Sequence, residues 1–184
     1  MKISRLKPGI LLIFVIFVLI EGISLVTYRT AVLGQIEENK TISAMKTKIE
    51  LEEIILSEDE QKALDLVNEY RTENGLNELK PFSELQEVAK LKAEDLVNNK
   101  YFAHISPTLG TPFEMLKNNE IDYKIAGENL AGSPTPEKAV EAWINSTSHR
   151  ENILEEKFEY TGIYVIESPV YGNIFVQLFI FLGK

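Results

Sequence analysis

The sequence predicts an α+β domain in which several amphipathic helices precede a small antiparallel sheet. Serine and threonine N-caps, each followed by apolar residues at helical spacing, recur between residues 57 and 154. After residue 160 the chain changes to runs rich in β-branched and aromatic residues, which are typical of strands. A chain of 184 residues that is 45% hydrophobic is long enough for one such domain and an appendage.

The appendage is an apolar N-terminal segment. Lys2, Arg5 and Lys7 precede an apolar run from Gly9 to Val26 that is interrupted by Glu21. The run is just long enough to span a bilayer, and no clean A-x-A cleavage site follows it. Over residues 1–27 we therefore expect one transmembrane helix, an uncleaved signal-anchor in preference to a signal peptide. The domain then lies outside the cell membrane, or is secreted if the segment is cleaved.

A polar linker connects this segment to the domain. Residues 28–56 are mixed in charge and contain no proline, and Ile42, Met45 and Ile49 keep a helical spacing that Glu52 interrupts. The stretch predicts a partly helical stalk, with a short coiled coil as the alternative.

The domain over residues 57–184 begins with helices whose starts are marked by capping residues. Ser57 and Glu60 form a capping box, and the helix that they start ends at Asn74-Gly75. Further helices are expected to start at Ser83, at Thr111 with Glu114, at Thr135-Pro136, and at His149 after a capping box of Ser148 and Glu151.

The strands follow the helices. Residues 160–182 predict two strands joined by a turn around Ser168–Asn173, and a third strand is expected near Tyr123–Ala126.

Charge and composition exclude several classes of function. The net charge of −9 argues against nucleic acid as a partner, because phosphates require a basic surface. The absence of cysteine excludes disulfides, thiolate metal sites and a cysteine nucleophile.

Three polar residues are candidates for chemistry. The chain has two histidines, His104 and His149, and both lie among small and polar residues. Glu128 lies in the stretch AGENLAG. None belongs to a local metal or nucleophile motif, so any site must be assembled from three distant segments.

Several motifs occur together in a recognisable order. FAHISP, GENLAG, AWINSTSHRENIL, YTGIYV and FVQLF resemble the CAP superfamily in its bacterial branch. This superfamily, also called the SCP domain, comprises cysteine-rich secretory proteins, antigen 5 and pathogenesis-related proteins. The resemblance covers about residues 60–182. It implies a three-layer α-β-α sandwich, with an antiparallel sheet between helical layers and a cleft open to solvent.

The resemblance also implies a site. His104, Glu128 and His149 match three of the four polar residues of the family's cleft, whereas Ser146 stands where eukaryotic members carry the second acid. In members that bind zinc the two histidines are the protein ligands, so His104 and His149 are candidate ligands of Zn²⁺ and Glu128 could orient one imidazole. A helix that begins at His149 would disfavour protonation of that imidazole. The alternative is structural: two imidazoles bound to Glu128 and backbone that tie the three segments together.

Three classes of function remain open at this stage. The preferred one is a cell-surface module that binds a lipid, glycan, peptide or protein through the His/Glu cleft. The second is a hydrolase of peptide or cell-wall material, zinc-dependent or acid/base, with His104, Glu128 and His149 as catalytic residues. The third is a structural component of the cell envelope or spore coat.

Overall fold

The computed structural model describes Thr30, residues 32–43 and residues 54–183. The predicted signal-anchor over residues 1–27 lies outside these residues. The chain divides into two compact units, Met1–Lys46 and Thr47–Lys184. In the first unit, residues 32–43 of the predicted stalk are helical. No helix of the described residues is both long and apolar enough to cross a membrane.

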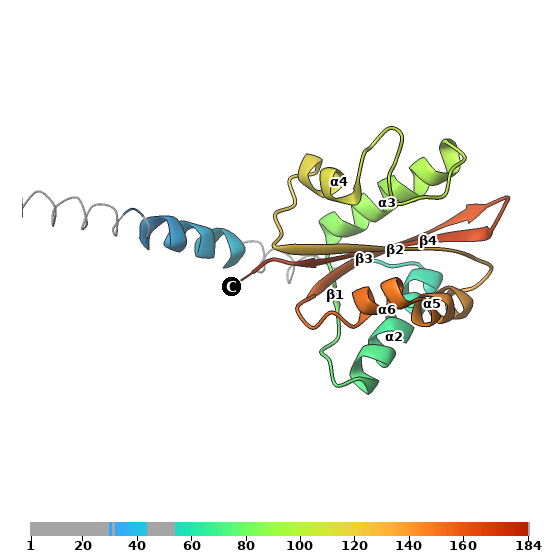
Figure 1. The fold of residues 1–184 in the computed structure, drawn as a ribbon, viewed down its shortest axis with the longest axis horizontal. Helices are drawn as coiled ribbons and strands as arrows, with labels where there is room; N and C mark the ends of the chain where they lie inside the picture. Colours follow the sequence, from blue (N-terminus) through green and yellow to red (C-terminus); the bar gives the residue numbers. More distant parts are fainter. Residues whose placement is uncertain (1–29, 31, 44–53, 184) are drawn as a thin grey trace, which may run out of the picture. The chain divides into compact units, whose positions relative to one another are not determined.

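The second unit has three layers (Figure 1), as the sequence predicts for an α+β domain. Helices α3 and α4 cover one face of the sheet, and α2, α5 and α6 cover the other. The elements are α2 (Glu58–Glu73), β1 (Lys80–Pro81), α3 (Ser83–Asn98), α4 (Pro112–Asn118), β2 (Ile125–Ser133), α5 (Pro136–Asn145), α6 (Thr147–Ile153), β3 (Tyr160–Ser168) and β4 (Gly172–Phe181).

Four of the five predicted helix starts, including that of α3 at Ser83, are confirmed, and the fifth differs. The capping boxes of Ser57 with Glu60 and of Thr111 with Glu114 are both formed, and Thr135 caps α5. The helix expected to begin at His149 begins instead at Thr147, with Ser146 as its N-cap. The reason is that the carbonyl of Ser146 already accepts the first helical hydrogen bond, from the amide of Arg150 at 2.9 Å.

The sheet is mixed, and the prediction of a purely antiparallel sheet is wrong at one edge. Its strand order is β1-β3-β4-β2, with β4 antiparallel to both β2 and β3. The two-residue β1 pairs parallel to β3 and is too short to leave a sequence signal. Strand β2 extends to Ser133, beyond the predicted Tyr123–Ala126, because pairing with β4 overrides the weak strand propensity of its glycines and Asn129.

Side chains cover the outer edge of β3 where β1 ends. The amide of Gln86 accepts a hydrogen bond from the Ile163 N–H at 2.9 Å and donates one to the Ile163 carbonyl. Glu60 Oε1 accepts from the Val165 N–H at 3.2 Å, while its Oε2 accepts from the Ser57 N–H at 2.8 Å. One carboxylate therefore both caps α2 and closes the sheet edge.

The core lies on both faces of the sheet. On β4, Phe175 and Phe179 belong to the buried cluster formed with α2 and α5, which includes the fully buried Trp143. On the other face, a Cβ added at Gly162 of β3 would come within 2.5 Å of the Leu85 carbonyl oxygen. The backbone of α3 therefore lies directly on β3 at a position that only glycine leaves open.

Candidate functional site

The site is organised by the alternation of side chains along β2. Neighbouring residues of a strand point to opposite faces of the sheet. Glu128 points to the side of α3 and α4 and contacts His104, whereas Asn129 points to the other side and contacts α6. Two consecutive residues of β2 thus contact both segments that carry a histidine.

His104 and Glu128 form a close pair. His104 Nδ1 lies 2.7 Å from Glu128 Oε1, and the side chains are 52% and 3% exposed, respectively. Burial raises the pKa of Glu128, although the hydrogen bond with His104 and the charges of Lys92 and His104 oppose the shift. Glu128 Oε2 is buried and has no hydrogen-bond partner among the described residues. The pair therefore presents the half-exposed imidazole of His104, which the buried carboxyl group of Glu128 holds in place.

His149 joins this pair from α6. It is the third residue of that helix, and its ring centroid lies 6.2 Å from that of His104. Burial lowers the pKa of His149, and the charge of His104 lowers it further. The expected preference for the neutral imidazole is thus found, but its cause is burial rather than a helix start at His149. The structure brings the three predicted residues, His104, Glu128 and His149, together; we call them the histidine site.

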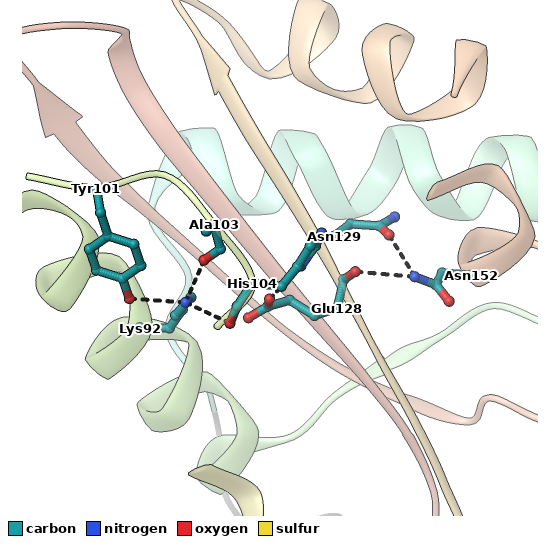
Figure 2. A network of polar contacts seen from close by, with 7 residues as sticks. All are labelled: Lys92, Tyr101, Ala103, His104, Glu128, Asn129 and Asn152. Atoms are coloured by element: carbon teal, nitrogen blue, oxygen red, sulfur yellow. Dashed lines mark hydrogen bonds and ion pairs between the residues drawn. The ribbon is translucent and has the colours of Figure 1, made fainter. Parts of the chain in front are cut away.

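Two asparagines hold the segments of the histidine site together (Figure 2). Asn129 donates to the His149 carbonyl at 3.1 Å. Figure 2 shows the other two bonds, in which Asn152 donates to Asn129 Oδ1 at 2.9 Å and to the Glu128 carbonyl at 3.1 Å. A Cβ at Gly127 would lie 3.0 Å from Asn152 Oδ1, so the glycine leaves room for this bridge. Gly127 therefore leaves room for Asn152, Glu128 binds His104, and Asn129 binds the His149 carbonyl.

A buried lysine that was not predicted from the sequence lies beside the site. The ammonium group of Lys92 donates to Tyr101 Oη at 3.0 Å, to the Ala103 carbonyl at 2.8 Å and to the His104 carbonyl at 2.9 Å (Figure 2). A signal was present, because Lys92 continues the inward spacing of Leu85, Ala89 and Leu96 on α3. A charged residue on an apolar helix face indicates either a buried network or a site.

Asp95, three residues later on α3, holds the same loop. Its carboxylate accepts hydrogen bonds from Tyr101, from Ser106 at 2.7 Å and from Thr108. These bonds lower the pKa of Asp95 despite the opposing effect of burial. Ser106 is itself buried, so it serves as a structural hydroxyl and does not join the histidine site. Glu114 is bound to Thr111 in its capping box and stays outside the site as well.

The donor set does not fit a resident zinc ion. Catalytic zinc usually has three protein ligands, and structural zinc has four. The site offers two imidazoles, and His104 could ligate only through Nε2 because its Nδ1 is bound to Glu128, so the protein ligands number two. The residues that the structure describes contain no group of three or more His, Asp or Glu side chains able to hold a metal. Ser146, at the position of the absent acid, is the N-cap of α6 and supplies no carboxylate.

Comparison with known proteins decides the family. Residues 64–179 match the sequence profile of the cysteine-rich secretory protein family, CAP. The chain belongs to this family. Its CAP domain is similar to the Bacillus subtilis protein YkwD, with 44% identity over 122 residues, which are 66% of this chain and 46% of YkwD. It is also similar to the B. subtilis membrane protein YlbC, with 32% identity over 82% of this chain and 42% of YlbC. The chain thus spans less than half the length of these relatives.

Solved structures of bacterial CAP domains have the same fold. An extracellular SCP-domain protein of Bacillus anthracis matches with a TM-score of 0.62 and 30% identity, over 70% of this chain and 45% of that one. An outer surface protein of Borrelia burgdorferi matches with a TM-score of 0.63 and 28% identity, over 71% of this chain and 97% of that one. The relatives of this CAP chain thus include extracellular, outer-surface and membrane proteins.

Proposed function

We propose that this chain is a membrane-anchored, extracytoplasmic binding module whose CAP domain holds its ligand at the histidine site. The observation that carries the proposal is the half-exposed imidazole of His104 fixed on the buried carboxyl of Glu128 at 2.7 Å. The apolar run of residues 9–26 supports the anchor, and the extracellular and membrane relatives support the compartment.

The site chemistry favours a ligand rich in hydrogen-bond donors. The contact with Glu128 occupies Nδ1 of His104, so Nε2 is the nitrogen left for a ligand, and in the neutral form of the ring with the proton on Nδ1 it accepts a hydrogen bond. His149, with its lowered pKa, offers a second neutral imidazole. Phe102 and Ile105, which precede and follow His104 in the chain, are exposed and offer apolar surface. Glycan hydroxyls or peptide amides suit this arrangement better than a bare hydrocarbon chain.

Soluble peptidoglycan fragments test the proposal because they carry both a glycan and a peptide. We would titrate them into the full-length chain in detergent micelles and follow the two imidazoles by NMR, then repeat the titration with the separated glycan and peptide parts. Both imidazole signals should shift. Glu128→Gln should weaken binding by about tenfold or more, because it removes a charge-assisted hydrogen bond behind His104. Glu87→Gln makes the same change at an exposed position of α3 and should bind normally.

Two results would contradict the binding proposal. One is the absence of an imidazole shift with the whole fragments and with both separated parts. The other is an equal affinity of the Glu128→Gln and Glu87→Gln variants. The anchor is tested separately by fractionating cells: the chain should remain with the membrane, and its domain should be cleaved by protease added outside.

The geometry of the pair also favours a second candidate, a metal-free acid/base hydrolase. A carboxyl group that binds one imidazole nitrogen while the other is exposed has the arrangement of an oriented general base. In this reading Glu128 fixes the ring, and Nε2 of His104 takes a proton from the attacking water. Turnover of the same fragments that is lost in His104→Ala would support the hydrolase, whereas binding without turnover supports the module.

A further inference from the structure

We propose that Lys92 is a positioning residue that fixes the backbone presenting His104 to Glu128. Its ammonium group is fully buried, yet two of its three hydrogen bonds go to main-chain carbonyls, those of Ala103 and His104 itself. A lysine thus holds His104 by its backbone while the imidazole of the same residue stays exposed to solvent. This inference does not depend on the identity of a ligand.

The environment of Lys92 shows why a charged side chain is present. The other inward residues of α3, such as Leu85, Ala89 and Leu96, are buried and apolar, so packing alone would be met by a hydrocarbon side chain. Burying an ammonium group is costly, and replacing buried charges by apolar residues is often neutral or stabilising. The three acceptors satisfy all three N–H groups of Lys92. The presence of a charged side chain here is therefore explained by its hydrogen bonds to the backbone at Ala103 and His104.

Asp95 holds the same loop from a second point. We call residues 99–111, which connect α3 to α4, the histidine loop. Tyr101 contacts both Lys92 and Asp95, and Ser106 and Thr108 bind Asp95 on the far side of His104. The histidine loop is thus hydrogen-bonded to two charged side chains, Lys92 and Asp95, which lie about one helical turn apart on α3. His104 lies between these two points of attachment.

Lys92 also connects the loop to the charge of the site. Its positive charge is among those that oppose the rise in the pKa of Glu128. Because all of its N–H groups are used elsewhere, Lys92 acts on Glu128 through space and on His104 through the backbone. Loss of Lys92 should therefore disturb the His104–Glu128 hydrogen bond although neither partner is changed.

The test is Lys92→Met in the full-length chain, in detergent micelles and without ligand. Methionine has a similar length but cannot donate a hydrogen bond, so the carbonyls of Ala103 and His104 are released to solvent. Exchange of the Ser106 amide, which donates to the Gly110 carbonyl within this loop at 2.8 Å, should become about 10- to 100-fold faster as the loop loses its hydrogen bonds to the charged group. The Nδ1–H proton signal of His104, which reports the bond to Glu128, should broaden or disappear, while the exchange of α5 stays unchanged.

Two further variants make the test decisive. Lys90→Met is the matched control, because it makes the same change on α3 outside the network and should leave both readouts unchanged. Lys92→Gln keeps an amide donor without the charge and should give intermediate exchange. If Lys92→Met does not fold, Lys92→Gln is judged by the same criteria. A wild-type exchange rate of the Ser106 amide together with an unchanged Nδ1–H signal would overturn the proposal.

Discussion

Substitution of Gly162 by alanine should destabilise the domain more than a single added methyl group would suggest. The new Cβ would lie 2.5 Å from the Leu85 carbonyl oxygen and 2.6 Å from the Gln86 nitrogen, and it would also contact the Leu85 carbonyl carbon. All three are backbone atoms of α3, so no side-chain rotation can relieve the clash. The helix and β3 must move apart, and this weakens the packing along their whole contact.

The cost follows from the rigidity of these neighbours. Overpacking in a core typically costs about 1–3 kcal/mol, and backbone neighbours place this site at the upper end of that range. For a domain of this size, about 3 kcal/mol corresponds to a fall in melting temperature of roughly 10 °C.

Thermal and chemical unfolding of Gly162→Ala, compared with wild type, measure this cost. Gly75→Ala is the control. Gly75 has φ +77° but nothing within 4 Å of an added Cβ, so only its backbone strain of about 1–2 kcal/mol should appear. The steric reasoning would be refuted if Gly162→Ala melted within about 2 °C of wild type, or if Gly75→Ala were the more damaging variant.

Three other predictions concern Arg71, His149 and Thr111. Arg71 is fully buried and donates to the carbonyls of residues 77, 153, 155 and 158. Arg71→Met should therefore lower the free energy of unfolding by about 3–5 kcal/mol, measured by urea denaturation. A loss below about 1 kcal/mol would contradict this expectation. Burial lowers the pKa of His149 in the folded state from 6.5, so the unfolded chain takes up this proton first as the pH falls. The stability due to neutral His149 is therefore present above about pH 6.5 and is lost below it. Between about pH 7 and pH 5.5, the His149→Gln variant should lose less stability than wild type. An equal loss would show that the pKa of His149 is not lowered in the folded state. Thr111→Ala removes the cap of α4 and should cost about 1 kcal/mol without affecting ligand binding, which denaturation and the fragment titration check.

Local signals in the sequence predicted much of the fold. Ser57 with Glu60, Thr111 with Glu114 and Thr135-Pro136 start helices because capping depends on residues within one turn. The hairpin of β3 and β4 was visible for the same reason, since both strands and their turn are adjacent in the chain. Strand β1 could not be predicted from local signals, because its two residues form a strand only by pairing with β3.

The three residues of the histidine site could be predicted from the sequence, but the residues that hold them in place could not. The resemblance to the CAP family pointed to His104, Glu128 and His149, and the structure places them together. The inward spacing on α3 could have indicated that Lys92 is buried, but its role was hidden because its acceptors include main-chain carbonyls, which carry no sequence signature. The roles of Asn129 and Asn152 were hidden as well, because they connect a strand to a helix through contacts that are 20 and 24 residues apart in the chain.

The side chains that cover β3 affect how copies of the domain behave beside one another. An open strand edge can pair with another chain, and such pairing leads to aggregation. Gln86 and Glu60 already occupy the groups at Ile163 and Val165 through which a neighbouring chain would join the sheet. Under the proposed anchoring, copies would lie at high local density on a membrane surface, where even weak edge pairing would accumulate. Replacing Glu60 would uncap a helix and open this edge in the same step, turning a modest loss of stability into a tendency to form chain-to-chain sheets.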